Sequence, residues 1–210
     1  MAEFQPILSM SATYNSGDRL GQYRGTVIYS GGILTGTSQS AAQCVDFAKA
    51  FASTQFGTNL NGTGNAVDYG SQNAISSAFG ANNLSSLGGY RVYENSGSAM
   101  PQENDIISWS GGGGGLGHVG IIAEVQFNNK TGQGYVYTLE QNARRDQALF
   151  PQPVTRSYGP DGKPIYIVGN RLGGYQVQGW ARYENSSKVP GSEKYTSTPA
   201  TPAPKTPRNF

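Results

Sequence analysis

Residues 40–48 read Ser-Ala-Ala-Gln-Cys-Val-Asp-Phe-Ala and hold the only cysteine of the chain, Cys44. Ser40 is a typical helix N-cap, and Gln43 three residues later completes a capping-box pattern. Apolar side chains then recur every three or four residues, which predicts a helix over residues 40–56. A thiol in the first turn lies near free backbone N–H groups and the positive end of the helix dipole, which favours the reactive thiolate.

A lone cysteine is more often a buried apolar side chain than a nucleophile, so a second group must support the chemistry. The chain has one histidine, His118, which follows a glycine-rich loop and opens a predicted strand over residues 118–125. A cysteine nucleophile needs such a base to accept its proton.

The histidine in turn needs a polar partner to fix its tautomer and stabilise its charged form. Glu140 and Asn142 lie two residues apart in the next predicted strand, residues 135–142, and the period of a strand places them on one face. Each of these residues alone is better explained as a solvated strand end. Together with a cysteine at a helix start, in the order Cys, His, Glu, they indicate a nucleophilic active site.

Composition narrows the class of protein. A chain of 210 residues is long enough for one sizeable core. A charged fraction of 13% and a net charge of +2 argue against nucleic acid or an anionic membrane surface as a partner. No apolar run is long enough to span a membrane, and the first residues lack the basic and apolar regions of a secretory signal, so we expect neither membrane insertion nor that export signal.

The remaining elements form a strand-rich pattern with many glycines and tyrosines. Strands are predicted at residues 23–29, 90–93, 106–109, 118–125, 135–142, 165–168 and 177–183, and a second helix at 66–79. Tight turn signals between the three central strands predict that they pair consecutively and antiparallel. We therefore expect an N-terminal extension at residues 1–37, one α+β domain at 38–185, and a disordered tail or linker rich in Pro, Ser and Thr at 186–210.

Four blocks of sequence, in this order, resemble the CHAP family of cysteine, histidine-dependent amidohydrolases and peptidases. They are Gln43–Ala48, Asn104–Trp109, Gly117–Ile122 and Leu139–Asn142. The resemblance extends over about residues 38–183 and implies a papain-like α+β fold, in which the helix that bears the nucleophile packs on an antiparallel sheet.

The resemblance also implies a role for each site residue. Cys44 would be the nucleophile, and His118 the general base and then the acid for the leaving amine. Glu140 would orient His118, and Asn142 would be the fourth polar member of the site. Gln43 has two open roles, since its amide either helps the Cys44 backbone N–H to bind the oxyanion or completes the capping box.

Neither a cofactor nor a metal is expected. One histidine and one cysteine make a zinc site improbable. Several phage-lysin relatives bind calcium through acidic residues just before the cysteine. The corresponding positions here, Thr35, Thr37, Gln39 and Ala41, carry no carboxylate.

Three function classes remain open. The first, which the family favours, is cleavage of amide bonds in peptidoglycan by a lysin or an interbacterial toxin. Such an enzyme acts in the periplasm or cell wall after delivery or lysis-dependent release, and a toxin would also have an immunity protein as partner. The second is an amidase for a glutathionylspermidine-like conjugate, since residues 44–48 and Gly179-Trp180 resemble that branch too. The third, a non-catalytic binding module, is disfavoured because every expected polar residue is present.

Overall fold

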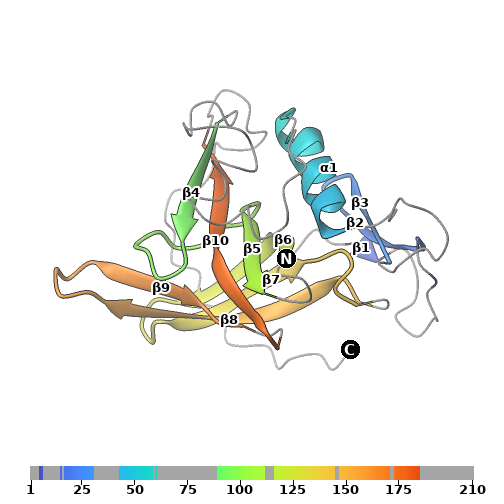
Figure 1. Cartoon of the computed structure of the whole chain (residues 1–210). Helices are drawn as coiled ribbons and strands as arrows, with labels where there is room; N and C mark the ends of the chain where they lie inside the picture. Colours follow the sequence, from blue (N-terminus) through green and yellow to red (C-terminus); the bar gives the residue numbers. More distant parts are fainter. Residues whose placement is uncertain are drawn as a thin grey trace.

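The computed structural model describes residues 5–6, 15, 17–30, 43–58, 60, 89–111, 116–144, 147–170 and 173–184. These residues form one helix and ten strands (Figure 1). The elements are β1 (Gln5–Pro6), β2 (Arg19–Tyr23), β3 (Thr26–Tyr29), α1 (Cys44–Phe56), β4 (Tyr90–Glu94), β5 (Ile106–Gly111), β6 (His118–Asn128), β7 (Gln133–Leu139), β8 (Leu149–Tyr158), β9 (Pro164–Val168) and β10 (Tyr175–Tyr183).

Seven of the strands form one antiparallel sheet in the order β4-β10-β5-β6-β7-β8-β9. The three central strands, β5, β6 and β7, pair consecutively, which confirms the arrangement predicted from their turn signals. The sheet is strongly curled, so that β4 and β10 run across the direction of β8 and β9 in Figure 1. The described part of the chain therefore combines a helix with an antiparallel sheet.

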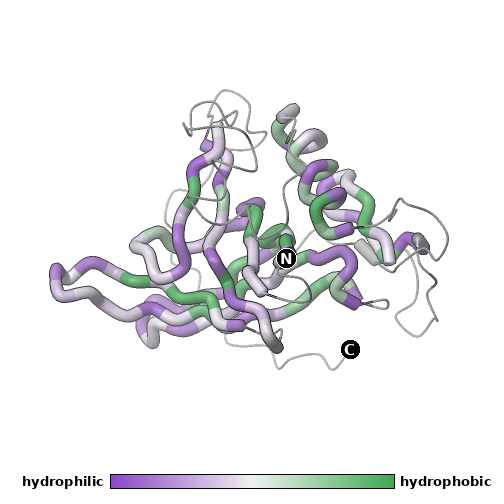
Figure 2. Tube along the Cα trace, viewed as in Figure 1, coloured by the Kyte–Doolittle hydropathy of each residue, from purple (hydrophilic) through white to green (hydrophobic). Residues whose placement is uncertain are grey.

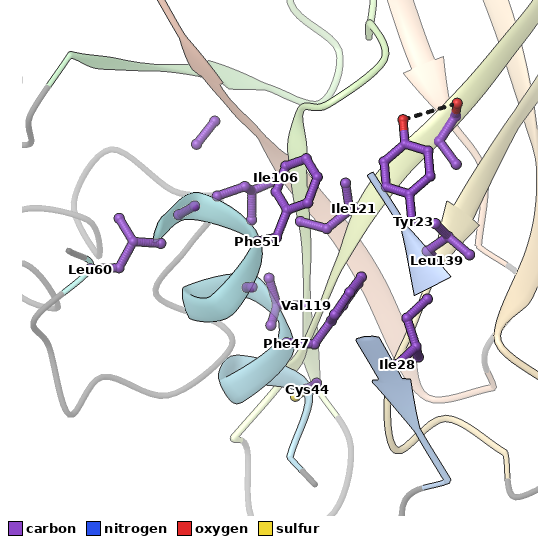
Figure 3. Packing of buried hydrophobic residues seen from close by; sticks show 14 of the residues in the cluster. Tyr23, Ile28, Cys44, Phe47, Phe51, Leu60, Ile106, Val119, Ile121 and Leu139 are labelled. Atoms are coloured by element: carbon purple, nitrogen blue, oxygen red, sulfur yellow. Dashed lines mark hydrogen bonds between the residues drawn. The ribbon is translucent and has the colours of Figure 1, made fainter. Parts of the chain in front are cut away.

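Helix α1 packs its apolar side chains onto one face of this sheet (Figure 3). Phe47 and Phe51 are almost fully buried and lie against Val119 and Ile121 of β6. Hydrophobic and hydrophilic residues alternate along α1 in Figure 2, and the buried residues of the helix recur every three or four positions, as predicted. The packing holds the first turn of α1 beside the start of β6.

The start of α1 differs from the prediction. The helix begins at Cys44 with Gln43 as its N-cap, so the predicted cap by Ser40, which lies outside the described residues, is wrong. The Gln43 N–H donates to Asp46 Oδ2 at 3.1 Å, so the acidic side chain three residues after the cap closes the first turn. This shift makes Cys44 the first residue of the helix.

The predicted single strand over residues 23–29 is also wrong, because the chain turns back at Arg24 and Gly25. Both residues have positive φ, 47° and 79°, as a two-residue hairpin of the favoured twist requires. The resulting β2–β3 hairpin joins β1 in a small sheet. Its Tyr23 ring stacks on Phe51 of α1 at 5.8 Å between ring centroids, within the core that α1 shares with the large sheet. The domain boundary at residue 37 stays a prediction.

Strand β8 has no counterpart in the sequence prediction, since Pro151 and Pro153 lie within it. A proline cannot donate to a neighbouring strand and is tolerated only where no such bond is needed. Here β9 pairs with β8 only from Val154 onward, so both prolines precede the segment that β9 covers. On its other side, β8 pairs with β7 over its length from Leu149 to Thr155.

A second hydrophobic core lies on the other face of the curled sheet, and Trp109 and Trp180 are its largest side chains. Just before β5, the buried Asp105 accepts two hydrogen bonds from the Arg182 guanidinium of β10, at 2.9 and 2.8 Å. Burial raises the pKa of Asp105 to about 6, although Arg182 opposes the shift. This ion pair ties β10 to the loop that leads into the centre of the sheet.

Two predictions fall on segments that the structure does not describe. They are the second helix at 66–79 and the tail at 186–210. Among the described residues, no helix is long and apolar enough to cross a membrane.

Candidate active site

The first turn of α1 presents Cys44 to the start of β6. The thiol is largely buried, with 8% of the residue exposed, and belongs to the edge of the core beneath the helix (Figure 3). As the first helical residue, Cys44 has a backbone N–H with no acceptor inside the helix. This position offers a reacting carbonyl both a sulfur atom and a hydrogen-bond donor.

His118 begins β6 and joins the cysteine to a buried carboxylate. Its Nε2 lies 2.9 Å from Glu140 Oε2, and both side chains are almost completely buried. Burial lowers the pKa of His118, but the hydrogen-bond and coulombic interactions of the imidazole with Cys44 and Glu140 outweigh burial and raise the pKa to about 9. Because Nε2 faces Glu140, Nδ1 is the ring nitrogen left for the thiol.

Aromatic rings enclose the imidazole on two further sides. The Trp109 ring of β5 lies 5.4 Å from it and the Tyr175 ring of β10 lies 6.3 Å from it, measured between centroids. Strand pairing explains the first contact, since Trp109 is directly opposite His118 in the β5–β6 ladder. These rings limit how the imidazole can rotate away from Glu140.

Gly120 makes room for the carboxylate. A Cβ at this position would lie 2.9 Å from Glu140 Cγ and 2.8 Å from the Leu139 carbonyl oxygen, and both distances are shorter than real contacts. The Glu140 side chain therefore passes over the strand at the one residue that has no side chain of its own. Sequence reasoning quoted Gly120 only as part of a motif and missed this role.

Residues 140–142 follow the end of the strand, and each of them contacts a residue of the site. The predicted strand to Asn142 is too long, since β7 ends at Leu139 and Asn142 has a positive φ of 63°. Alternation along a strand therefore does not explain why Glu140 and Asn142 both face the site. Asn142 reaches it from a left-handed backbone conformation, which asparagine adopts more readily than most residues.

Gln43 is held from two sides by this segment. Asn142 Nδ2 donates to Gln43 Oε1 at 3.0 Å, so the amide of Gln43 keeps its Nε2 as the donor end. The buried Gln141 donates from Nε2 to the Gln43 carbonyl oxygen at 2.8 Å, and its Oε1 accepts from the Tyr29 N–H. The sequence prediction placed only Glu140 and Asn142 on the face of the strand toward the site, so it missed the contacts of Gln141 between them. Its position between two predicted site residues was the available signal.

The structure thus brings Cys44, His118 and Glu140 together, with Asn142 joined to Gln43 beside them. Residues 35, 37, 39 and 41, which correspond to the calcium-binding positions of some phage-lysin relatives, lie outside the described residues. Within the described ranges, no three His, Cys, Asp or Glu side chains are grouped to hold a metal ion.

Comparison with known proteins identifies the family. The family model for the CHAP domain matches residues 35–142, a range that contains all five site residues. No curated protein matches the chain. Because the match extends over just over half of the 210 residues, the chain belongs to the CHAP family, whose members are hydrolases of the amidase and peptidase type.

Proposed function

We propose that this protein is a cysteine amidohydrolase with a papain-like fold that cleaves amide bonds in peptidoglycan. Membership of the CHAP family supports an amidase or peptidase activity, and peptidoglycan is the typical substrate of that family. The observation that carries the proposal is the position of His118, between the Cys44 thiol and the Glu140 carboxylate.

In this mechanism, His118 takes the proton of the Cys44 thiol, and the sulfur attacks the carbonyl carbon of the substrate amide. The imidazolium that forms is stabilised by Glu140, which lies 2.9 Å from Nε2. With its pKa raised to about 9, His118 keeps this proton at neutral pH until the leaving amine takes it.

The tetrahedral intermediate needs donors for its oxyanion. The Cys44 backbone N–H, at the start of α1, supplies one, and Gln43 Nε2 supplies the second, since Asn142 occupies the oxygen end of that amide. The C–N bond then breaks, and His118 gives its proton to the leaving amine. Water, deprotonated by His118, hydrolyses the thioester and releases the free acid and the thiol.

The test uses purified full-length protein and isolated peptidoglycan. We expect new amine and carboxyl ends at one type of amide bond, identified by mass spectrometry of the released fragments. Cys44→Ala should reduce the rate by at least about 10⁴-fold, since loss of the nucleophile removes the covalent pathway. Full activity in Cys44→Ala would remove the catalytic assignment.

The same assay separates the alternative substrate. An intact peptidoglycan sample together with hydrolysis of a glutathionylspermidine-like conjugate would assign the chain to the polyamine branch. With peptidoglycan as substrate, the proposed site of action is the periplasm or cell wall, reached by delivery or lysis-dependent release. Co-purification with an immunity protein would then distinguish a toxin from a lysin.

A further inference from the structure

Two more side chains contact the Glu140 carboxylate, on the oxygen that does not face His118. Thr138 Oγ1 lies 2.6 Å from Glu140 Oε1, and Gln152 Nε2 lies 3.3 Å from the same oxygen. Thr138 belongs to β7 and Gln152 to β8, and all three residues are fully buried. The two oxygens of the carboxylate therefore have separate partners.

The hydrogen bonds point toward the carboxylate. A threonine hydroxyl has one proton, and Thr138 Oγ1 lies closer to Glu140 Oε1 than to the Phe150 carbonyl oxygen at 3.2 Å. Gln152 Nε2 also donates to Thr138 Oγ1, at 3.3 Å. This bond occupies the acceptor side of the hydroxyl, so the hydroxyl proton is directed to Glu140.

The other end of the Gln152 amide indicates why the residue is present. Gln152 Oε1 is buried and has no hydrogen-bond partner among the residues that the structure describes. A buried carbonyl oxygen without a partner destabilises a fold. Turning the amide over would set this oxygen against Glu140 Oε1, so the carboxylate fixes the orientation. The unpaired Oε1 of Gln152 therefore lowers the stability of the fold, while Nε2 of the same side chain donates to Glu140.

We propose that Thr138 and Gln152 are positioning residues, which hold the Glu140 carboxylate ionised and turned toward His118. The inference rests on the proposed function, in which Glu140 orients the catalytic base. Burial favours the neutral acid, whereas donors to a carboxylate favour the charged form. With Oε1 held by two donors, Oε2 stays in place while His118 exchanges a proton with Cys44.

The direct test is an NMR titration of the His118 imidazole in the full-length protein without substrate. His118 is the only histidine, so its signal needs no assignment by mutation. Among the described residues, Cys44 from α1, Glu140 after β7 and Tyr175 from β10 are the titratable groups that face this ring. Variants at Thr138 and Gln152 change none of them.

The variants are Thr138→Val and Gln152→Met, which keep side-chain size and remove the donors, singly and together. In the double variant we expect the His118 midpoint to fall from about 9 by about one pH unit, because the released carboxylate no longer keeps Oε2 at hydrogen-bond distance. Thr138→Ser retains the hydroxyl and should keep the wild-type midpoint. Val154→Ala, two residues from Gln152 on the same face of β8, loosens the core without touching Glu140 and is the matched control.

A midpoint in the double variant that equals or exceeds that of the wild type overturns the proposal, as does an equal fall in Val154→Ala. With substrate, kcat of the double variant should fall about tenfold at unchanged KM, since positioning acts on the chemical step. If the wild type leaves peptidoglycan intact while the His118 midpoint falls as expected, the proposed function fails and the positioning role stands.

Discussion

Asp105 and Glu140 are both almost completely buried, and each faces a cation, but the two cations differ in kind. Asp105 binds the Arg182 guanidinium through two hydrogen bonds, and arginine keeps its charge at any accessible pH. Glu140 binds the His118 imidazole through one hydrogen bond, and an imidazole, unlike a guanidinium, can gain and lose a proton in the accessible pH range.

The difference separates a structural ion pair from one suited to chemistry. The Arg182 pair joins β10 to the loop before β5 and includes a further hydrogen bond, from the guanidinium to the Met100 carbonyl oxygen. In the His118 pair, the imidazole also contacts the Cys44 thiol, so a proton can move between the ring and the sulfur. Burial of an acid therefore does not indicate catalysis by itself. The partner of the buried acid determines whether the pair is structural or suited to catalysis, and four predictions test this contrast.

The largest effect is expected for Glu140→Gln, which keeps the shape of the side chain and removes its charge. We expect kcat/KM to fall by about 10³-fold, because the imidazolium loses its counter-charge. Rates of amine release from peptidoglycan measure this effect. The free energy of unfolding, from urea titration, should change much less than activity. Wild-type kcat/KM in this variant would contradict the role given to Glu140.

Asp105→Asn should show the opposite pattern. It leaves the Arg182 guanidinium without a charged partner, so we expect the free energy of unfolding to fall by about 3 kcal/mol. Activity per folded molecule should stay at the wild-type level. Asp161→Asn removes the acid of an exposed ion pair with Lys163 and is the control, with no measurable effect. A variant of Asp105 that is stable but inactive would reverse the distinction.

The pH dependence of stability distinguishes the two pairs in the same way. Both folded pKa values are raised, so each group stabilises the fold at low pH and the contribution is lost as pH rises. For Asp105 the loss falls between 3.8 and about 6, and for His118 between 6.5 and about 9. The upper step amounts to about 3 kcal/mol. Urea titrations at a series of pH values should show this step in the wild type and a much smaller one in Glu140→Gln.

The smallest of these effects is expected for Gly120→Ala, which adds one methyl group beneath Glu140. The new Cβ meets Glu140 Cγ and the Leu139 carbonyl oxygen, so the carboxylate must shift, and we expect kcat/KM to fall by about 10²-fold. Gly173→Ala places a methyl group in open space and is the control. Equal activity in the two variants would show that Glu140 tolerates displacement.

The parts of the site that sequence predicts are those with a local signature. A single sulfur at the start of an amphipathic segment and a single imidazole before a β-branched run were enough to locate α1 and β6. The paired order of β5, β6 and β7 followed from the turns between them. These features depend on neighbours in the sequence, and the structure confirms them.

The parts that sequence missed depend on contacts between distant segments. Strand β8 was missed because it contains two prolines, which usually argue against a strand. They are tolerated here because β9 pairs with β8 only after them, and the sequence does not show where that pairing stops. Because β8 was missed, Gln152 was missed too, since its contacts are with Thr138 of the neighbouring strand β7 and with Glu140. The contacts of Gln141 were missed for a related reason, since a strand was extended past the point where the backbone turns.

The shared core of α1 and the β2–β3 hairpin bears on how the protein can be divided for expression. A fragment trimmed to residues 35–142 would remove Tyr23 from the Phe51 ring and β10 from the side of β5. Bared aromatic surface of this kind drives aggregation. The shortest piece that we expect to fold on its own therefore begins ahead of β2 and continues past β10.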